Sequence, residues 1–119
     1  MCHVLIIEDE AMIALDLESL LWLQGATSFS FAASEDEAVA AARLRRPVVI
    51  TSDVTLVQGT GPAAVATIRA EHGHIPVVYI SGTAPGCGPD DQLTRAFSKP
   101  LDRHVIASAF QDMWRLSCA

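Results

Sequence analysis

Residues 47–56 read PVVITSDVTL, a short apolar run rich in β-branched residues that ends on one carboxylate, Asp53. Such a run, followed by Gly59, Gly61 and Pro62, predicts a buried strand whose carboxyl end opens into a loop. Three other predicted strands end on polar groups in the same way, and these groups are Glu8, Asp9 and Glu10, then Ser81 and Gly82, and finally Lys99. In an open α/β sheet the functional crevice lies outside the carboxyl ends of the strands, so we expect these groups to converge.

Composition indicates one globular domain. The 119 residues are 50% hydrophobic and 18% charged, enough for one core around a sheet buried on both faces. The net charge of -6 gives no electrostatic basis for binding nucleic acid, so we expect no direct nucleic acid binding. Three widely spaced cysteines predict neither a disulfide framework nor a metal site, and they fit a reducing, cytoplasmic setting. No run approaches the roughly 18 apolar residues of a membrane span, so we expect no membrane association.

The chain alternates between short apolar runs and amphipathic segments. Strands are predicted at residues 3–8, 27–32, 47–53, 75–81 and 95–98, and helices at 11–24, 34–45, 64–73 and from 102 onward. This alternation predicts a doubly wound parallel sheet of α/β class with helices on both faces. Residues 82–91 hold three Gly and two Pro, so the helix before the last strand is predicted to be short or missing.

Several aromatic and imidazole side chains are interpreted as structural. Trp22 and Trp114 fall on predicted helices and are expected to be partly buried packing residues. The histidines show no metal-ligand spacing with a third partner. Ser34 and Glu37 have the spacing of a capping box at the start of the second helix.

The strand-end groups resemble the motif set of the receiver domain of two-component response regulators, a CheY-like, flavodoxin-like fold with strand order 2-1-3-4-5. The likeness covers essentially all of residues 1–119, which we expect to form one receiver domain. The motifs, each at a predicted strand end, are Glu8 and Asp9, then Asp53, then Ser81, and last Lys99 and Pro100. Each one alone is a weak signal, whereas all of them in this order are specific.

The resemblance implies that Asp53 accepts a phosphoryl group from a phosphohistidine, in a transfer dominated by positioning and charge neutralisation. A Mg²⁺ ion would neutralise the incoming charge, held by Glu8, Asp9 and Asp53 and by the backbone carbonyl of Thr55. The chain would thus be a signalling switch with weak self-catalysed phosphotransfer and dephosphorylation, rather than an enzyme. Its expected partner is a sensor histidine kinase or a histidine phosphotransfer protein. The downstream partner, and whether the chain forms a homodimer, stay open.

The resemblance also assigns roles at the last two strand ends. Lys99 would pair with Asp53 or with the phosphoryl oxygens, and the Ser81 hydroxyl would donate a hydrogen bond to a phosphoryl oxygen. The Lys99-Pro100 peptide bond is expected to be cis. Ala96 stands where receivers usually carry the aromatic residue whose rotamer reports phosphorylation. Residues 8–18 and 79–83 resemble a receiver subset with a Phe-Ala-Thr-Gly type motif, which is associated with HWE-type histidine kinases.

Two other functions are compatible with parts of this pattern. A pseudo-receiver would use the same fold as a constitutive protein-interaction module with its acidic pocket idle. A small metal-dependent phosphohydrolase using an aspartyl-phosphate is disfavoured, because no cap domain fits in 119 residues. The sequence also has no general acid two residues after Asp53, because Thr55 stands there.

Overall fold

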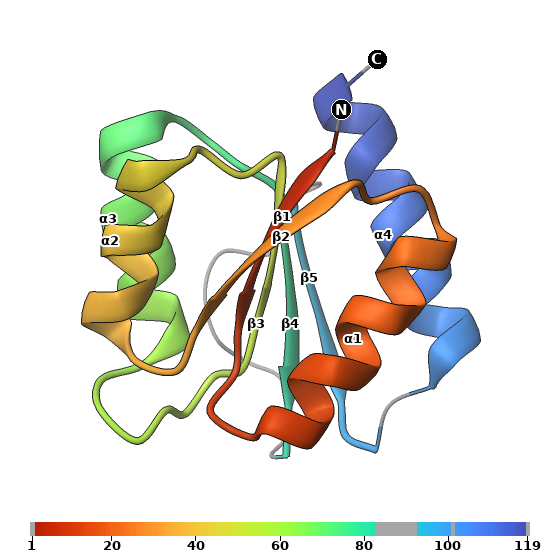
Figure 1. The fold of residues 1–119 in the computed structure, drawn as a ribbon, viewed down its shortest axis with the longest axis horizontal. Coiled ribbons are helices and arrows are strands. Elements are labelled where there is room, and N and C mark those ends of the chain that lie inside the picture. Colours follow the sequence, from red (N-terminus) through yellow and green to blue (C-terminus); the bar gives the residue numbers. More distant parts are fainter. Residues whose placement is uncertain (1, 83–92, 101, 119) are drawn as a thin grey trace.

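Five parallel strands form one sheet in the computed structural model, which describes residues 2–82, 93–100 and 102–118 (Figure 1). The sheet order is 2-1-3-4-5 and every neighbouring pair is parallel, which confirms the predicted doubly wound fold. The strands are β1 (His3–Ile7), β2 (Ser28–Ala32), β3 (Val49–Ser52), β4 (Val77–Ser81) and β5 (Thr94–Ser98). The helices are α1 (Ala11–Leu23), α2 (Glu35–Leu44), α3 (Gly61–His72) and α4 (Arg103–Cys118).

Helices cover both faces of the sheet, with α1 and α4 on one face and α2 and α3 on the other (Figure 1). Successive side chains of a strand point to opposite faces, so the buried central strands supply two separate cores. Val4 and Ile6 belong to the core under α1 and α4. Leu5 and Ile7 belong to the core under α2 and α3. The central strands are therefore anchored from both sides, which holds their carboxyl ends at one edge of the sheet.

The predicted cap of α2 is present. Ser34 Oγ accepts the backbone N–H of Glu37 at 3.2 Å, as a capping box requires. The Glu37 carboxylate accepts the N–H of Ala33 at 3.0 Å, one residue earlier than in the usual box. These two hydrogen bonds place the start of α2 directly after the chain leaves β2.

The third helix begins earlier than predicted. Gly61 and Pro62 were expected in the loop after β3, but they form the first turn of α3. Proline is tolerated there because its missing N–H would have no intrahelical acceptor. The Thr60 hydroxyl accepts the N–H of Ala63 at 3.2 Å and caps the helix.

The interpretation of Trp22 as a partly buried residue is wrong, since Trp22 is 61% exposed. It lies on the outer side of α1 beside the edge strand β2, with its ring centroid 6.5 Å from that of Phe29. β2 is an edge strand, since among the described strands none pairs with its outer edge. Trp114 is half-buried against the core under α1 and α4, as expected.

On β5, Ala96 packs against the core under α2 and α3, while Phe97 packs against the core on the other face. Phe97 therefore faces away from the position that Ala96 occupies. The predicted short or missing helix falls on residues 83–92, which lie outside the described residues. Among the helices that are described, none combines the length and the apolar character needed to cross a bilayer.

Candidate functional site

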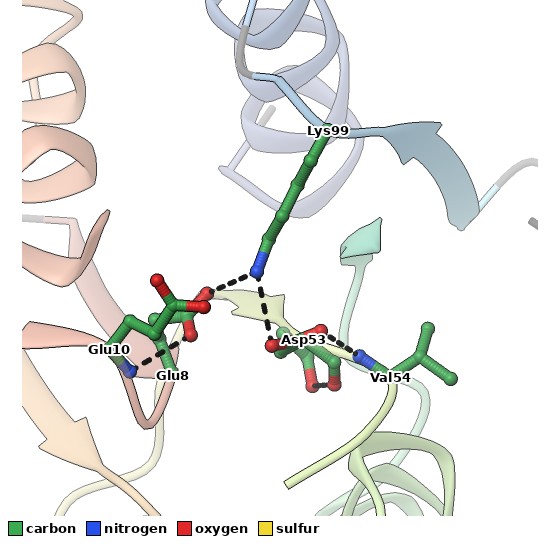
Figure 2. Close-up of polar contacts among 6 residues, drawn as sticks. Glu8, Glu10, Asp53, Val54 and Lys99 are labelled. Atoms are coloured by element: carbon green, nitrogen blue, oxygen red, sulfur yellow. Dashed lines mark hydrogen bonds and ion pairs between the residues drawn. The ribbon is translucent and has the colours of Figure 1, made fainter. Parts of the chain in front are cut away.

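Three strand ends meet at one lysine (Figure 2). Lys99 Nζ, just after β5, lies 3.2 Å from Asp53 Oδ2, just after β3, and 3.4 Å from Glu8 Oε1, just after β1. Glu8 and Asp53 are both buried, and the Lys99 side chain is only 18% exposed. The structure thus brings together three residues predicted to share a site, from positions far apart in the chain.

Backbone contacts hold Asp53 in place. Its N–H donates to the Ile7 carbonyl at 2.8 Å, which continues the pairing of β3 with β1 for one more residue. Its Oδ1 accepts the N–H of Val54 at 2.8 Å, so Oδ2 is the oxygen that contacts Lys99. One oxygen of the carboxylate is therefore bound to the main chain and the other to a cation.

The surroundings of Glu8 disfavour the charged form of its carboxyl group. Burial, together with the nearby charge of Asp53, raises its pKa from 4.5 to about 7. The backbone N–H of Glu10, which donates to Glu8 Oε2 at 3.1 Å, and the charge of Lys99 oppose this rise without cancelling it. Because burial is the largest cause of the raised pKa, a cation bound beside Glu8 would favour the ionised form that burial disfavours.

Lys99 is held at both its backbone and its ammonium group. Burial works against its charged form, but the hydrogen bond with Asp53 and the charge of Glu8 outweigh burial and raise the pKa of Lys99 above its ordinary value. Its backbone N–H donates to the Ser81 carbonyl at 2.6 Å, and the Lys99-Pro100 peptide bond is cis, as predicted. Lys99 is therefore a permanent cation at neutral pH.

The described residues include one group of three carboxylates, Glu8, Asp9 and Glu10, in which one oxygen from each lies within 4.8 Å of the other two. Hard oxygen donors of this kind suit Mg²⁺, which is commonly bound by one or two carboxylates and completed by water. The donor set therefore fits the predicted metal. The predicted ligand Asp53 is not a member of this group; its carboxylate contacts Lys99, which also contacts Glu8.

Ser81 and Thr55 are the remaining predicted site residues. Ser81 is buried at the end of β4, and its carbonyl is tied to the backbone of Lys99. Thr55 is exposed in the loop after β3, where it forms an isolated bridge with Thr60. Ser81 is thus the last residue of β4 and Thr55 follows the end of β3.

Sequence reasoning missed three contributors. Glu10 was not among the predicted metal ligands, yet its carboxylate lies with those of Glu8 and Asp9. Ser52 and Gly61 both pack against the backbone of Asp53: the Ser52 hydroxyl donates to the Asp53 carbonyl, and a Cβ at Gly61 would overlap that carbonyl oxygen. The sequence offered no signal for Gly61, which was expected in the loop after β3 and begins α3 only in the structure.

The fold and this site define a class of protein. Residues 4–110 match the response regulator receiver domain family, and the chain belongs to this family. It is 32% identical over 110 residues to the phyllosphere-induced regulator PhyR of Methylorubrum extorquens. The matched region covers 92% of this chain but only 39% of that relative, so the chain spans well under half of the curated protein's length.

Solved structures of receiver domains have the same fold as this chain. The receiver domain of PhyR from Erythrobacter litoralis superposes with a TM-score of 0.84 at 25% identity, covering 99% of this chain and 93% of that chain. The anti-anti-sigma factor PhyR of Bartonella quintana superposes with a TM-score of 0.82 at 25% identity, covering 97% of this chain and 49% of that one. A receiver protein from Sinorhizobium medicae, at 23% identity with a TM-score of 0.84 and coverage of 96% and 94%, shares the fold.

The raised pKa of Glu8 predicts how the stability of the metal-free protein depends on pH. The folded form binds the Glu8 proton more tightly than the unfolded form, so the stabilisation is complete below pH 4.5 and is lost as pH rises through about 7. This shift corresponds to about 3 kcal/mol in the free energy of unfolding. Urea unfolding in chelator across this range measures it. Glu8→Gln is expected to remove this component, and parallel pH curves for the wild type and the variant would contradict the assignment.

Proposed function

We propose that this chain is a phospho-accepting receiver, in which residues 1–119 form one signalling switch that carries the phosphoryl group on Asp53. The observation that carries the proposal is the contact of Lys99 Nζ with both Asp53 Oδ2 and Glu8 Oε1 at the meeting point of three strand ends. A buried carboxylate beside a fixed cation and a group of oxygen donors is suited to receive a charged phosphoryl group.

The proposed transfer uses Asp53 as the nucleophile. A carboxylate oxygen of Asp53 forms a bond to the phosphorus of a phosphohistidine, while the P–N bond breaks and the imidazole keeps the electron pair and then takes a proton. Lys99 would stay beside Asp53 and offset the negative charge of the incoming oxygens. The Ser81 hydroxyl would donate a hydrogen bond to one of these oxygens.

We also propose that Glu8, Asp9 and Asp53, with the backbone carbonyl of Thr55, hold Mg²⁺. If bound, the ion would supply positive charge that offsets the negative charge of the phosphoryl group. The raised pKa of Glu8 supports a cation site here, because a divalent ion favours the ionised form that burial disfavours.

A pair of variants tests the metal ligands. Asp9→Ala is expected to weaken Mg²⁺ binding at least about tenfold, because it removes a proposed ligand, whereas Glu10→Ala should weaken it less than about threefold. Both residues lie in the same acidic cluster, so the pair separates ligation from general negative charge. Titration with Mg²⁺, followed by backbone NMR shifts, measures both affinities. Equal losses would contradict the proposed ligand set.

The runner-up is the pseudo-receiver. In its favour, Lys99 contacts both buried carboxylates and so supplies a counter-charge without metal or phosphoryl group. Millimolar Mg²⁺ with beryllofluoride separates the two functions, since a working acceptor binds this phosphoryl mimic and shifts the amides around Asp53. An unchanged spectrum at saturating concentrations would favour the pseudo-receiver.

We propose a histidine kinase, of the HWE type, or a histidine phosphotransfer protein as the donor. This partner class follows from the family and from the motif resemblance at residues 79–83. The PhyR relatives extend well beyond the matched region. We therefore propose that the phosphorylation state of this receiver is read by a further protein domain; the Bartonella quintana relative is named an anti-anti-sigma factor.

A further inference from the structure

One peptide group, which joins Asp53 to Val54, connects the side chain of Ser52 to the carboxylate of Asp53. The carbonyl oxygen of this peptide accepts a hydrogen bond from Ser52 Oγ at 2.7 Å. The N–H of the same peptide donates to Asp53 Oδ1 at 2.8 Å. Because a peptide group is planar, the direction of its C=O also sets the direction of its N–H. The hydroxyl of Ser52 therefore constrains the orientation of the Asp53 carboxylate.

Gly61 packs against the carbonyl end of this peptide group. Its N–H donates to the Val54 carbonyl at 2.9 Å, and a Cβ at this position would overlap both the Asp53 carbonyl oxygen and Ser52 Oγ. Ser52 is only 2% exposed. Close packing leaves little room for a water molecule to take over if the hydroxyl were removed, so the loss would leave the carbonyl oxygen short of a donor.

This constraint fixes which oxygen of the Asp53 carboxylate contacts Val54 and which contacts Lys99. With Oδ1 bound to the Val54 N–H, Oδ2 lies 3.2 Å from Lys99 Nζ (Figure 2). If Ser52 did not fix the Asp53–Val54 peptide, the Val54 N–H would no longer be held in place, and the Asp53 carboxylate could rotate and exchange its two oxygens. Phosphoryl transfer depends mainly on positioning, so an acceptor that samples several orientations reacts more slowly.

We propose that Ser52 is a positioning residue for the acceptor, acting through the Asp53–Val54 peptide rather than on the phosphoryl group. Its hydroxyl holds the carbonyl end of this peptide, and the N–H end holds Asp53 Oδ1. The inference rests on the proposed function of Asp53, and it adds a residue on β3 to the phosphorylation machinery.

The neighbouring residue provides a matched control. Thr51 is 1% exposed on the same strand, and its Oγ1 has no hydrogen-bond partner among the described residues. Thr51→Val thus removes a buried β3 hydroxyl that does not hold the peptide. Ser52→Ala removes the one that does. Any effect specific to Ser52→Ala reports on the hydrogen bond rather than on the loss of a buried hydroxyl in general.

The first readout needs neither phosphoryl donor nor metal. Amide hydrogen exchange of Val54 is measured by NMR as a ratio to that of Ile6, which reports opening of the sheet as a whole. Ser52→Ala is expected to raise this ratio about tenfold and Thr51→Val to leave it unchanged. A ratio in Ser52→Ala equal to that of the wild type would overturn the proposal, even if the variant is less stable overall.

The second readout is the rate of phosphoryl incorporation from acetyl phosphate at saturating Mg²⁺. We expect a roughly tenfold fall in Ser52→Ala and less than a twofold change in Thr51→Val. A raised exchange ratio with an unchanged rate would reject the positioning role. If the wild type itself takes up no phosphoryl group, the proposed function of Asp53 fails, while the exchange ratio still decides whether Ser52 holds the carboxylate.

Discussion

Asp53→Asn is expected to reduce phosphoryl incorporation from acetyl phosphate to below about one hundredth of the wild-type rate, because the amide is a far weaker nucleophile than the carboxylate. The fold should be retained, since asparagine has the same shape and its side-chain oxygen can still accept the Val54 N–H. The variant also removes the repulsion between Asp53 and Glu8, so we expect the free energy of unfolding to change by no more than about 1 kcal/mol.

Intact-mass measurement over time gives the rate of incorporation. Asp36→Asn is a matched control, because Asp36 is an exposed carboxylate in the first turn of α2, outside the site. It should be phosphorylated like the wild type. Comparable labelling of Asp53→Asn and Asp36→Asn would show that another residue is the acceptor.

Lys99→Met is expected to have opposite effects on metal binding and on phosphorylation. Without the ammonium group, Glu8 and Asp53 lose a shared cation, so the site becomes more negative and Mg²⁺ should bind several-fold more tightly. The phosphoryl group loses its fixed counter-charge, so incorporation should slow by about 100-fold. A variant that merely disturbed the fold would lose both properties together.

The control for Lys99→Met is Arg95→Met, which removes a cation from β5. Arg95 forms an exposed ion pair with Asp112 at 3.6 Å, and such pairs contribute little. Arg95→Met should leave both the metal affinity and the rate unchanged. Weaker Mg²⁺ binding in Lys99→Met would contradict the role of Lys99 as a competing cation.

Lys99 is the only lysine in the sequence, so methylation with ¹³C gives one side-chain ammonium signal that follows the site directly.

The sequence predicted that Glu8, Asp53 and Lys99 would converge because these residues stand at strand ends. Once the apolar runs were recognised as parallel strands, Glu8, Asp53 and Lys99 had to reach the same edge of the sheet, whatever the loops between them do. The contact of Lys99 with both carboxylates agrees with this reasoning.

Features that depend on how one element packs against another were not predictable from spacing. The approach of Gly61 to the Asp53 carbonyl depends on how the start of α3 packs against the end of β3, and the sequence around Gly61 resembles an ordinary turn. Similarly, Trp22 has a place in a helical pattern, but its exposure follows from the position of α1 beside an edge strand. Helical periodicity does not specify whether a neighbouring strand is at the edge of its sheet.

The chemical identity of the acceptor can be read directly in the unaltered chain. The protein is incubated with acetyl phosphate and Mg²⁺, reduced with borohydride, which converts an aspartyl-phosphate to homoserine, and then digested and sequenced by mass spectrometry. The peptide that contains residues 47–56 should carry homoserine at position 53, and only when both donor and metal are present. Homoserine at another aspartate, or unmodified Asp53 under these conditions, would contradict the proposal that Asp53 accepts the phosphoryl group.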